Sequence, residues 1–154
     1  MIDRTDILPI EINVDKVLET HSRDKEIEIA KVKVNGALKK GRDSMIYTSR
    51  NLVTGNDPDT SLKIGQAISS GLIEIVQKLA CQPRYLVAKS GITSSDVATK
   101  GLKVKRARVL GQVLPGVPVW KLGEESLHPG ISYIIFPGNV GNDDALVAIQ
   151  QKLS

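Results

Sequence analysis

The sequence predicts a three-layer α/β domain in which helices cover both faces of a largely parallel central sheet. Stretches with apolar residues three and four positions apart alternate along the chain with short apolar runs of strand length, and turn-forming residues separate them. The 154 residues, 41% hydrophobic and 25% charged, suit a globular domain with a substantial core. We therefore expect residues 1–154 to form a single domain.

The first half of the chain predicts two strands and three helical segments. In chain order these are a strand at "LPIEINV", one or two helical turns at "DKVLET", a helix from a Ser22 cap to about Lys40, a strand at Asp43–Ser49 and a helix from Thr60 that Pro83 ends. The last of these has the clearest helical pattern in the chain.

The second half predicts four further strands and two helices. In chain order we expect a strand at "RYLVAK", a short helix at about Ser95–Lys100, strands in "VKRARVLGQVL", "GVPVWKL" and "SYIIF", and a helix from about Asp143. The segment "LPGVP" is interpreted as a rigid turn with an architectural role.

Composition limits where the protein acts. No apolar run approaches the roughly 20 residues that a membrane helix needs, and the N-terminus lacks the basic start and apolar stretch of a secretion signal. The single cysteine, Cys81, cannot form an internal disulfide. We expect a cytoplasmic protein with no membrane partner.

Basic residues and histidines give weaker signals. The net charge is +4, and "KGLKVKRAR" concentrates basic residues without the aromatic side chains that stack on single-stranded bases. Lysines that protect a sheet edge from pairing explain this segment equally well, so nucleic acid is not expected as a partner. His21 and His128 have no second ligand at metal spacing and are expected at the surface, so no metal-ligating residues are predicted.

Three strand ends carry the candidate site. "MIYTSRN" ends a strand in Thr48 and Ser49, "LVAKSGITSSD" ends one in Ser90 and Gly91, and "IIFPGNVGNDDAL" ends one at Gly138. Ligands of open α/β sheets bind beyond the carboxyl ends of the strands, where glycines admit a close backbone approach and helix N-termini attract anions. Each loop alone is also what an ordinary cap or turn looks like. Three such loops at one edge favour a phosphate site, although the P-loop and dinucleotide motifs are absent.

Three ordered motifs then resemble a known family. "KSGITSSDVATKGL", "RARVLGQVLPGVPVWKLG" and "FPGNVGNDDAL" look like the C-terminal nucleotide-binding domain of the four-carbon acid sugar kinase family, and the resemblance covers about Ile10 to Leu153. It implies an ATP-dependent kinase of carbohydrate metabolism, a transferase that phosphorylates a small sugar acid, with ATP and Mg²⁺ as cofactors. The family's N-terminal sugar-binding domain is missing from this sequence. The resemblance therefore implies a truncated chain that binds ATP weakly or not at all by itself and does not phosphorylate the sugar acid.

The resemblance also assigns site residues. The family's Gly-Gly-acid-Thr loop falls on Ser90, Gly91, Ile92 and Thr93, with Ser94 following; the other matches are Ser49 at its strand end, and Gly138 with Asn139 in the last loop. Two departures stand out. Ile92 replaces an acid and cannot bind Mg²⁺ or a ribose hydroxyl, and Ser90 replaces the first glycine.

A second class of function stays open at this stage. The chain could be a non-catalytic module that binds phosphate or nucleic acid, or a subunit that completes its sheet on a partner. A homo-oligomer is compatible with either reading.

Overall fold

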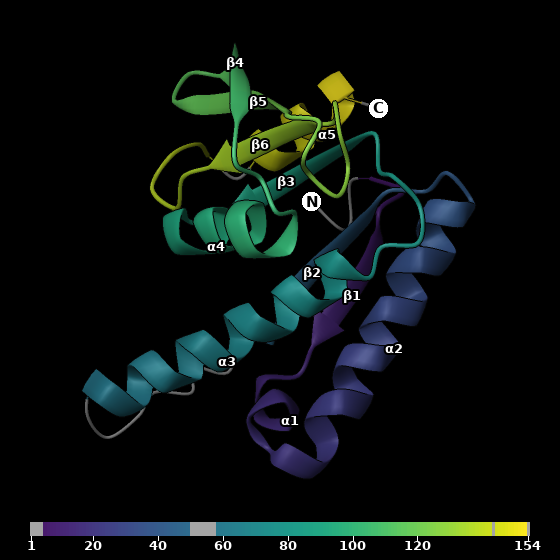
Figure 1. The fold of residues 1–154 in the computed structure, drawn as a ribbon, viewed down its shortest axis with the longest axis vertical. Helices are drawn as coiled ribbons and strands as arrows, with labels where there is room; N and C mark the ends of the chain where they lie inside the picture. The colour runs from purple at the N-terminus through teal and green to yellow at the C-terminus, as the bar shows by residue number, and fades with distance from the viewer. Residues whose placement is uncertain (1–4, 50–57, 143, 154) are drawn as a thin grey trace. The chain divides into compact units, whose positions relative to one another are not determined.

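The computed structural model describes residues 5–49, 58–142 and 144–153 and has the predicted α/β fold (Figure 1). The described residues form two compact units, which we call the N-terminal unit (Asp6–Cys81) and the C-terminal unit (Gln82 onward, with Thr5). The strands correspondingly form two sheets, one of two strands and one of four, and each contains a parallel pair.

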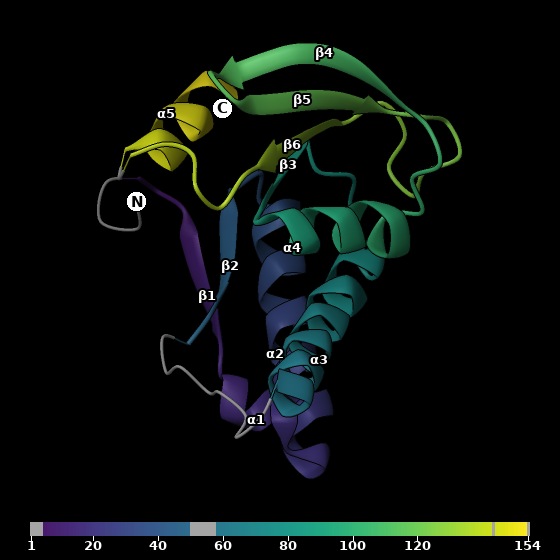
Figure 2. The same ribbon diagram turned by 90° about the vertical axis from the view of Figure 1, so that its left-hand side faces the viewer.

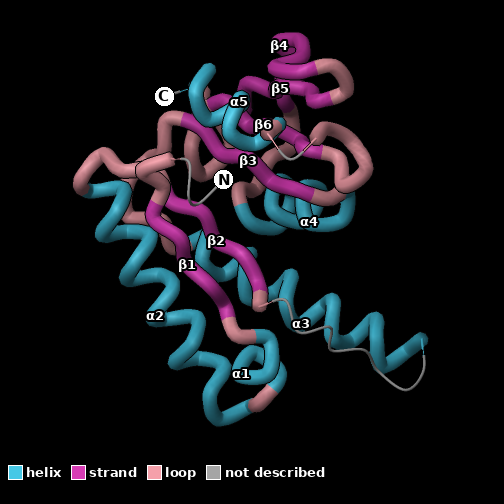
Figure 3. Tube along the Cα trace, turned by 180° about the vertical axis from the view of Figure 1, so that it is seen from behind, coloured by secondary structure: helices cyan, strands magenta, loops and turns pink. Residues whose placement is uncertain are grey.

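The N-terminal unit is a parallel strand pair with three helices. Its elements are β1 (Leu8–Ile12), α1 (Val14–Leu18), α2 (Thr20–Lys39), β2 (Ser44–Thr48) and α3 (Pro58–Gln77). β1 and β2 lie side by side in register from the Leu8–Ser44 pair to the Ile12–Thr48 pair (Figure 3). Apolar residues of β1, α1, α2 and α3 share one core; those that are buried are Ile10, Ile12, Val17, Ile27, Ala30, Val34 and Ile75.

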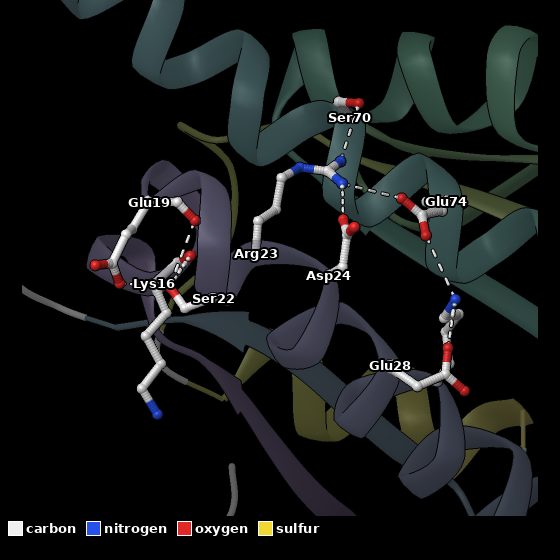
Figure 4. Close-up of polar contacts among 9 residues, drawn as sticks. Lys16, Glu19, Ser22, Arg23, Asp24, Glu28, Ser70 and Glu74 are labelled. Atoms are coloured by element: carbon white, nitrogen blue, oxygen red, sulfur yellow. Dashed lines mark hydrogen bonds and ion pairs between the residues drawn. The ribbon is translucent and has the colours of Figure 1, made fainter.

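The predicted Ser22 cap is wrong, since α2 begins at Thr20 and its N-cap is Glu19. Ser22 lies in the first turn of α2, with its hydroxyl 2.9 Å from the carbonyl oxygen of Lys16 and 2.6 Å from a carboxylate oxygen of Glu19 (Figure 4). The hydroxyl therefore donates to a carbonyl at the end of α1, the helix just before α2. The residue pattern of a helix start does not show that such a carbonyl needs a donor.

Ion pairs join α2 to α3. The carboxylate of Glu74 on α3 lies 3.3 Å from the guanidinium of Arg23 and 3.4 Å from the ammonium of Lys31, both on α2 (Figure 4). The hydrogen bond to Glu28, followed by that to Glu74, raises the pKa of Lys31. These partly exposed contacts add only a little to the apolar packing between the two helices.

The C-terminal unit contains a four-stranded mixed sheet. Its elements are β3 (Tyr85–Lys89), α4 (Gly91–Asp96), the π-helical turn η2 (Val97–Gly101), β4 (Ala107–Leu114), β5 (Val117–Leu122), β6 (Ser132–Phe136) and α5 (Ala145–Leu153). The strand order is β3-β6-β5-β4, in which β3 and β6 are parallel and the other two pairs are antiparallel (Figure 2).

α4 and α5 cover opposite faces of this sheet. Tyr133 on β6 donates a hydrogen bond to α4, whereas its strand neighbours Ile134 and Phe136 pack with residues of α5. Successive strand residues point to opposite faces, so the alternation along β6 gives this unit the predicted three layers.

One sequence expectation about the loops is wrong. His128 is only 9% exposed, and burial lowers the pKa of its imidazole. It follows Leu127, whose backbone N–H donates to the carbonyl of Leu102 and so draws this loop onto the end of η2. His21 on α2 is exposed, as expected.

Candidate functional site

Three chain connections meet at one edge of the four-stranded sheet. β3 and β6 are parallel neighbours that end at the paired residues Lys89 and Phe136. β5 runs antiparallel to β6, so its first residue, Val117, and the β4–β5 turn before it lie at the same edge (Figure 2). The β3–α4 turn, the β6–α5 loop and the β4–β5 turn therefore line this edge in that order, which we call the carboxyl edge.

Ser90 has a strained backbone in the β3–α4 turn. Its φ is 92° and its ψ 147°, and its N–H donates to the carbonyl of Phe136 at 2.9 Å. Glycine adopts such a conformation readily, whereas another residue held there costs on the order of 1–3 kcal/mol. Ser90 thus keeps the backbone shape expected of the glycine that the resemblance places at this position.

Hydrogen bonds of the buried Ser94 and Tyr133 side chains stabilise this turn. The hydroxyl of Ser94, a residue only 3% exposed, lies 2.6 Å from the carbonyl oxygen of Ser90 and 2.8 Å from that of Ala88. The hydroxyl of Tyr133 donates to the carbonyl of Ser94 at 2.7 Å, and burial raises the pKa of Tyr133, so it remains protonated. The Ser94 hydroxyl is therefore already engaged inside the protein, and a contact between Ser94 and a ligand stays a prediction.

The residues after Ser90 leave backbone donors open. The N–H groups of Gly91, Ile92 and Thr93 find no acceptor among the described residues, as is usual in the first turn of a helix. A Cβ built on Gly91 meets no atom within 4 Å, and the side chain of Ile92 is 77% exposed. This turn has space for a ligand at its amides.

The β6–α5 loop is open at one end and tight at the other. Gly138 and Asn139 are exposed, and a Cβ on Gly138 meets nothing within 4 Å. Gly141 has φ +85°, and a Cβ there would lie 2.7 Å from that of Ala145 and 3.0 Å from the Phe136 ring. Only glycine fits at position 141, while position 138 leaves room above the backbone.

The β4–β5 turn is the third segment at the carboxyl edge. Sequence reasoning did not place this turn there. Residues of this turn, of the β6–α5 loop and of α5 surround a hollow of about 450 Å³. Its walls are mainly apolar and are formed by Leu114, Pro115, Val117, Val140, Ala145 and Ala148, with Asn142 and Asp144 among the polar residues that line it. "LPGVP" was interpreted as architecture alone, and only the antiparallel pairing of β5 with β6 reveals its place.

Charged side chains near the carboxyl edge include a lysine beside the β3–α4 turn and an aspartate paired with a lysine. The ammonium of Lys89 lies 4.4 Å from the centroid of the Phe136 ring, an arrangement that holds a positive charge beside the β3–α4 turn. Asp96 on α4 pairs with Lys100 at 2.7 Å. In the part of the chain that the structure describes, no group of three or more His, Cys, Asp or Glu side chains could hold a metal ion.

Ser49 belongs to the N-terminal unit and follows β2. Its hydroxyl accepts the N–H of Val14 at 3.1 Å, and its own N–H donates to Ile12 at 2.8 Å. Ser49 therefore closes the start of α1, and its participation in a site with Ser90 and Gly138 stays a prediction.

The comparison with protein families decides the broad identity. Residues 2–146 match the family described as "Nucleotide-binding C-terminal domain". The chain belongs to this family. The nucleotide-binding domain that the motifs predicted is thereby confirmed, and no curated protein matches the sequence.

Solved structures share the fold of this nucleotide-binding domain. A Haemophilus influenzae protein, HI1011, of the domain-of-unknown-function family DUF1537 is 22% identical, with a TM-score of 0.72 over 97% of this chain and 35% of its own. A "putative tRNA synthase" from Salmonella typhimurium LT2 is 16% identical, with a TM-score of 0.72 over 99% of this chain and 37% of its own. A DUF1537 protein from Bordetella bronchiseptica, a domain-swapped dimer with bound citrate, is 16% identical, with a TM-score of 0.68 over 99% and 34%. This chain thus spans about a third of the length of these proteins.

No described helix is both long and apolar enough to cross a lipid bilayer.

Proposed function

We propose that this chain is the ATP-binding part of an ATP-dependent kinase that phosphorylates a small sugar acid. The observation that carries the proposal is the carboxyl edge, where the open amides after Ser90 and the uncovered Gly138 follow two neighbouring parallel strands, β3 and β6. Membership of the nucleotide-binding family supports a nucleotide as the ligand. The motif resemblance supports the acid sugar kinase.

The chemistry follows from what each part supplies. Backbone N–H groups at a strand-to-helix turn bind phosphate oxygens, and a phosphoryl transfer needs chiefly such positioning and charge stabilisation. Mg²⁺ would accompany the phosphates, and Ile92 offers it no ligand. The sugar acid and the base for its hydroxyl group would come from a sugar-binding domain outside this sequence. We therefore expect the chain alone to bind ATP weakly and not to phosphorylate a sugar acid.

A titration of ATP and Mg²⁺ tests the proposal. Weak binding, with a Kd of about 1 mM, is expected for the wild type. Gly91→Asp should abolish it, because a carboxylate placed among the open amides repels phosphate, while the space around Gly91 lets the variant fold. Gly65→Asp is the matched control, since Gly65 is exposed on α3 and a Cβ there also meets nothing within 4 Å. Equal ATP affinity of the two variants would contradict the proposal.

One observation favours a second candidate, a subunit that completes its sheet on a partner. β4 is an edge strand whose residues 107–112 are all exposed, among them Val109 at 65% and Leu110 at 51%. The basic residues Lys105, Arg106 and Arg108 lie at its start, so a short RNA is a further ligand to titrate. RNA binding with steep salt dependence and no ATP binding would favour a non-catalytic nucleic-acid-binding module over the kinase.

A further inference from the structure

The hollow at the carboxyl edge has the size and lining of a site for a flat apolar group. Its volume of about 450 Å³ falls within the usual range for small-molecule sites, about 300–1,000 Å³. Apolar walls come from the end of β4, the β4–β5 turn, the β6–α5 loop and α5, through Leu114, Pro115, Val140 and Ala148 in that order. An aromatic ring buried between such side chains gains from the area removed from water.

The same hollow disfavours phosphate. A phosphate group transferred there would lose its hydration to apolar walls without charged partners in return. The described residues that line the hollow include no lysine or arginine. The positive charge of Lys89 instead lies at the end of β3, beside the strained Ser90 turn.

The order of the strands sets the spacing between these two places. The β3–α4 turn and the β4–β5 turn are separated by β6, so they lie two strand spacings, or about 10 Å, apart across the sheet. The β6–α5 loop lies between them and approaches both. Phe136 accepts the N–H of Ser90, and the Val140 side chain lies 3.4 Å from a Cβ built on Gly116.

We propose that the hollow between the β4–β5 turn and α5 takes the nucleobase of the bound nucleotide. The nucleotide then lies across the β6–α5 loop, with the ribose above Gly138 and the phosphates at the amides after Ser90. This inference rests on the proposed nucleotide site and adds to it the direction in which the ligand lies. It gives the "LPGVP" turn a part in binding.

The test compares ATP with inorganic tripolyphosphate, which has the phosphates and lacks the base. Ala148→Phe fills the hollow, and Ala107→Phe places the same side chain at the exposed far end of β4 as the control. Ala148→Phe should weaken ATP by about tenfold or more and leave tripolyphosphate within about twofold, and the control should change neither. In saturation-transfer NMR of the wild type, the adenine protons should receive the strongest saturation. Circular dichroism checks folding, and Ala148→Leu replaces the Phe variant if that variant unfolds.

The outcomes separate the two proposals. Unchanged ATP affinity in the filled variant, or an equal loss of ATP and tripolyphosphate, would overturn the base site and leave the proposed function standing. If the wild type binds neither ligand at about 10 mM, the proposed function fails and the base site fails with it.

Discussion

Two serines end parallel strands in this chain, and the two units use them differently. In the N-terminal unit, the Ser49 hydroxyl accepts a hydrogen bond from the Val14 N–H at the start of α1. In the C-terminal unit, Ser90 makes no side-chain cap, adopts positive φ and leaves the following amides open. The comparison shows that the residue type at a strand end does not fix the role of its hydroxyl, since the Ser49 hydroxyl accepts a backbone N–H and the Ser90 side chain makes no cap.

The two strand ends are also held by different means. At the end of β2, the Ser49 hydroxyl accepts the N–H of Val14. The carboxyl edge keeps its shape through contacts beneath it, namely the close packing at Gly141 and the hydrogen bonds of Ser94 and Tyr133. Substitutions at these positions test whether the difference holds.

Gly141→Ala should have the largest effect on the carboxyl edge. The added Cβ would overlap Ala145 and approach the Phe136 ring at positive φ, so we expect the free energy of unfolding to fall by about 2–4 kcal/mol. Gly138→Ala, in open space, should change it by less than about 0.5 kcal/mol. Urea denaturation of both variants measures the difference, and equal stabilities would show that packing does not hold this loop.

Tyr133→Phe should have the next largest effect. It leaves the carbonyl of Ser94 without its buried donor, which lowers the free energy of unfolding by about 1–3 kcal/mol. Hydrogen exchange of the Ser90 and Ser94 amides, which donate to Phe136 and Ser90, should become faster in the variant, because the turn loses its support. Unchanged hydrogen exchange together with unchanged stability would show that the Tyr133 hydrogen bond does not hold the β3–α4 turn in shape.

The smallest effects should have opposite signs at the two serines. Ser90→Gly relieves the positive φ and should raise the free energy of unfolding by about 1 kcal/mol, less any entropy gained by the unfolded chain. Ser49→Ala removes the acceptor of the Val14 N–H and should lower it by about 1 kcal/mol. Thermal denaturation of the pair provides the measurement, and shifts of the same sign would contradict the contrast between the two units.

Much of the fold could be predicted because its patterns are local. The expected strands at Asp43–Ser49 and "RYLVAK" appear as β2 and β3, and the helix expected after Thr60 is α3, which begins at Pro58. The apolar spacing of Ile64 to Leu79 was sufficient for that helix, since helical periodicity needs no knowledge of the remaining chain.

The rest depended on contacts that residue patterns do not specify. Ser22 was misread because its acceptor is a carbonyl of the preceding helix. The place of Pro115 and Gly116 at the carboxyl edge depends on which strand β5 pairs with, and sequence spacing does not give strand order. The positive φ of Ser90 had no signal in its residue type, although the resemblance placed a glycine there.

The central position of β6 has a consequence for folding. β6 follows every other strand in the chain, yet it lies between β3 and β5 in the sheet. Its pairing with β3 joins residues more than forty positions apart, and contacts of such long range form late because a large loop must close first. During synthesis, therefore, a partly made chain that ends before β6 cannot form the carboxyl edge. The chain can bind its ligand there only after β6 has paired with β3 and β5.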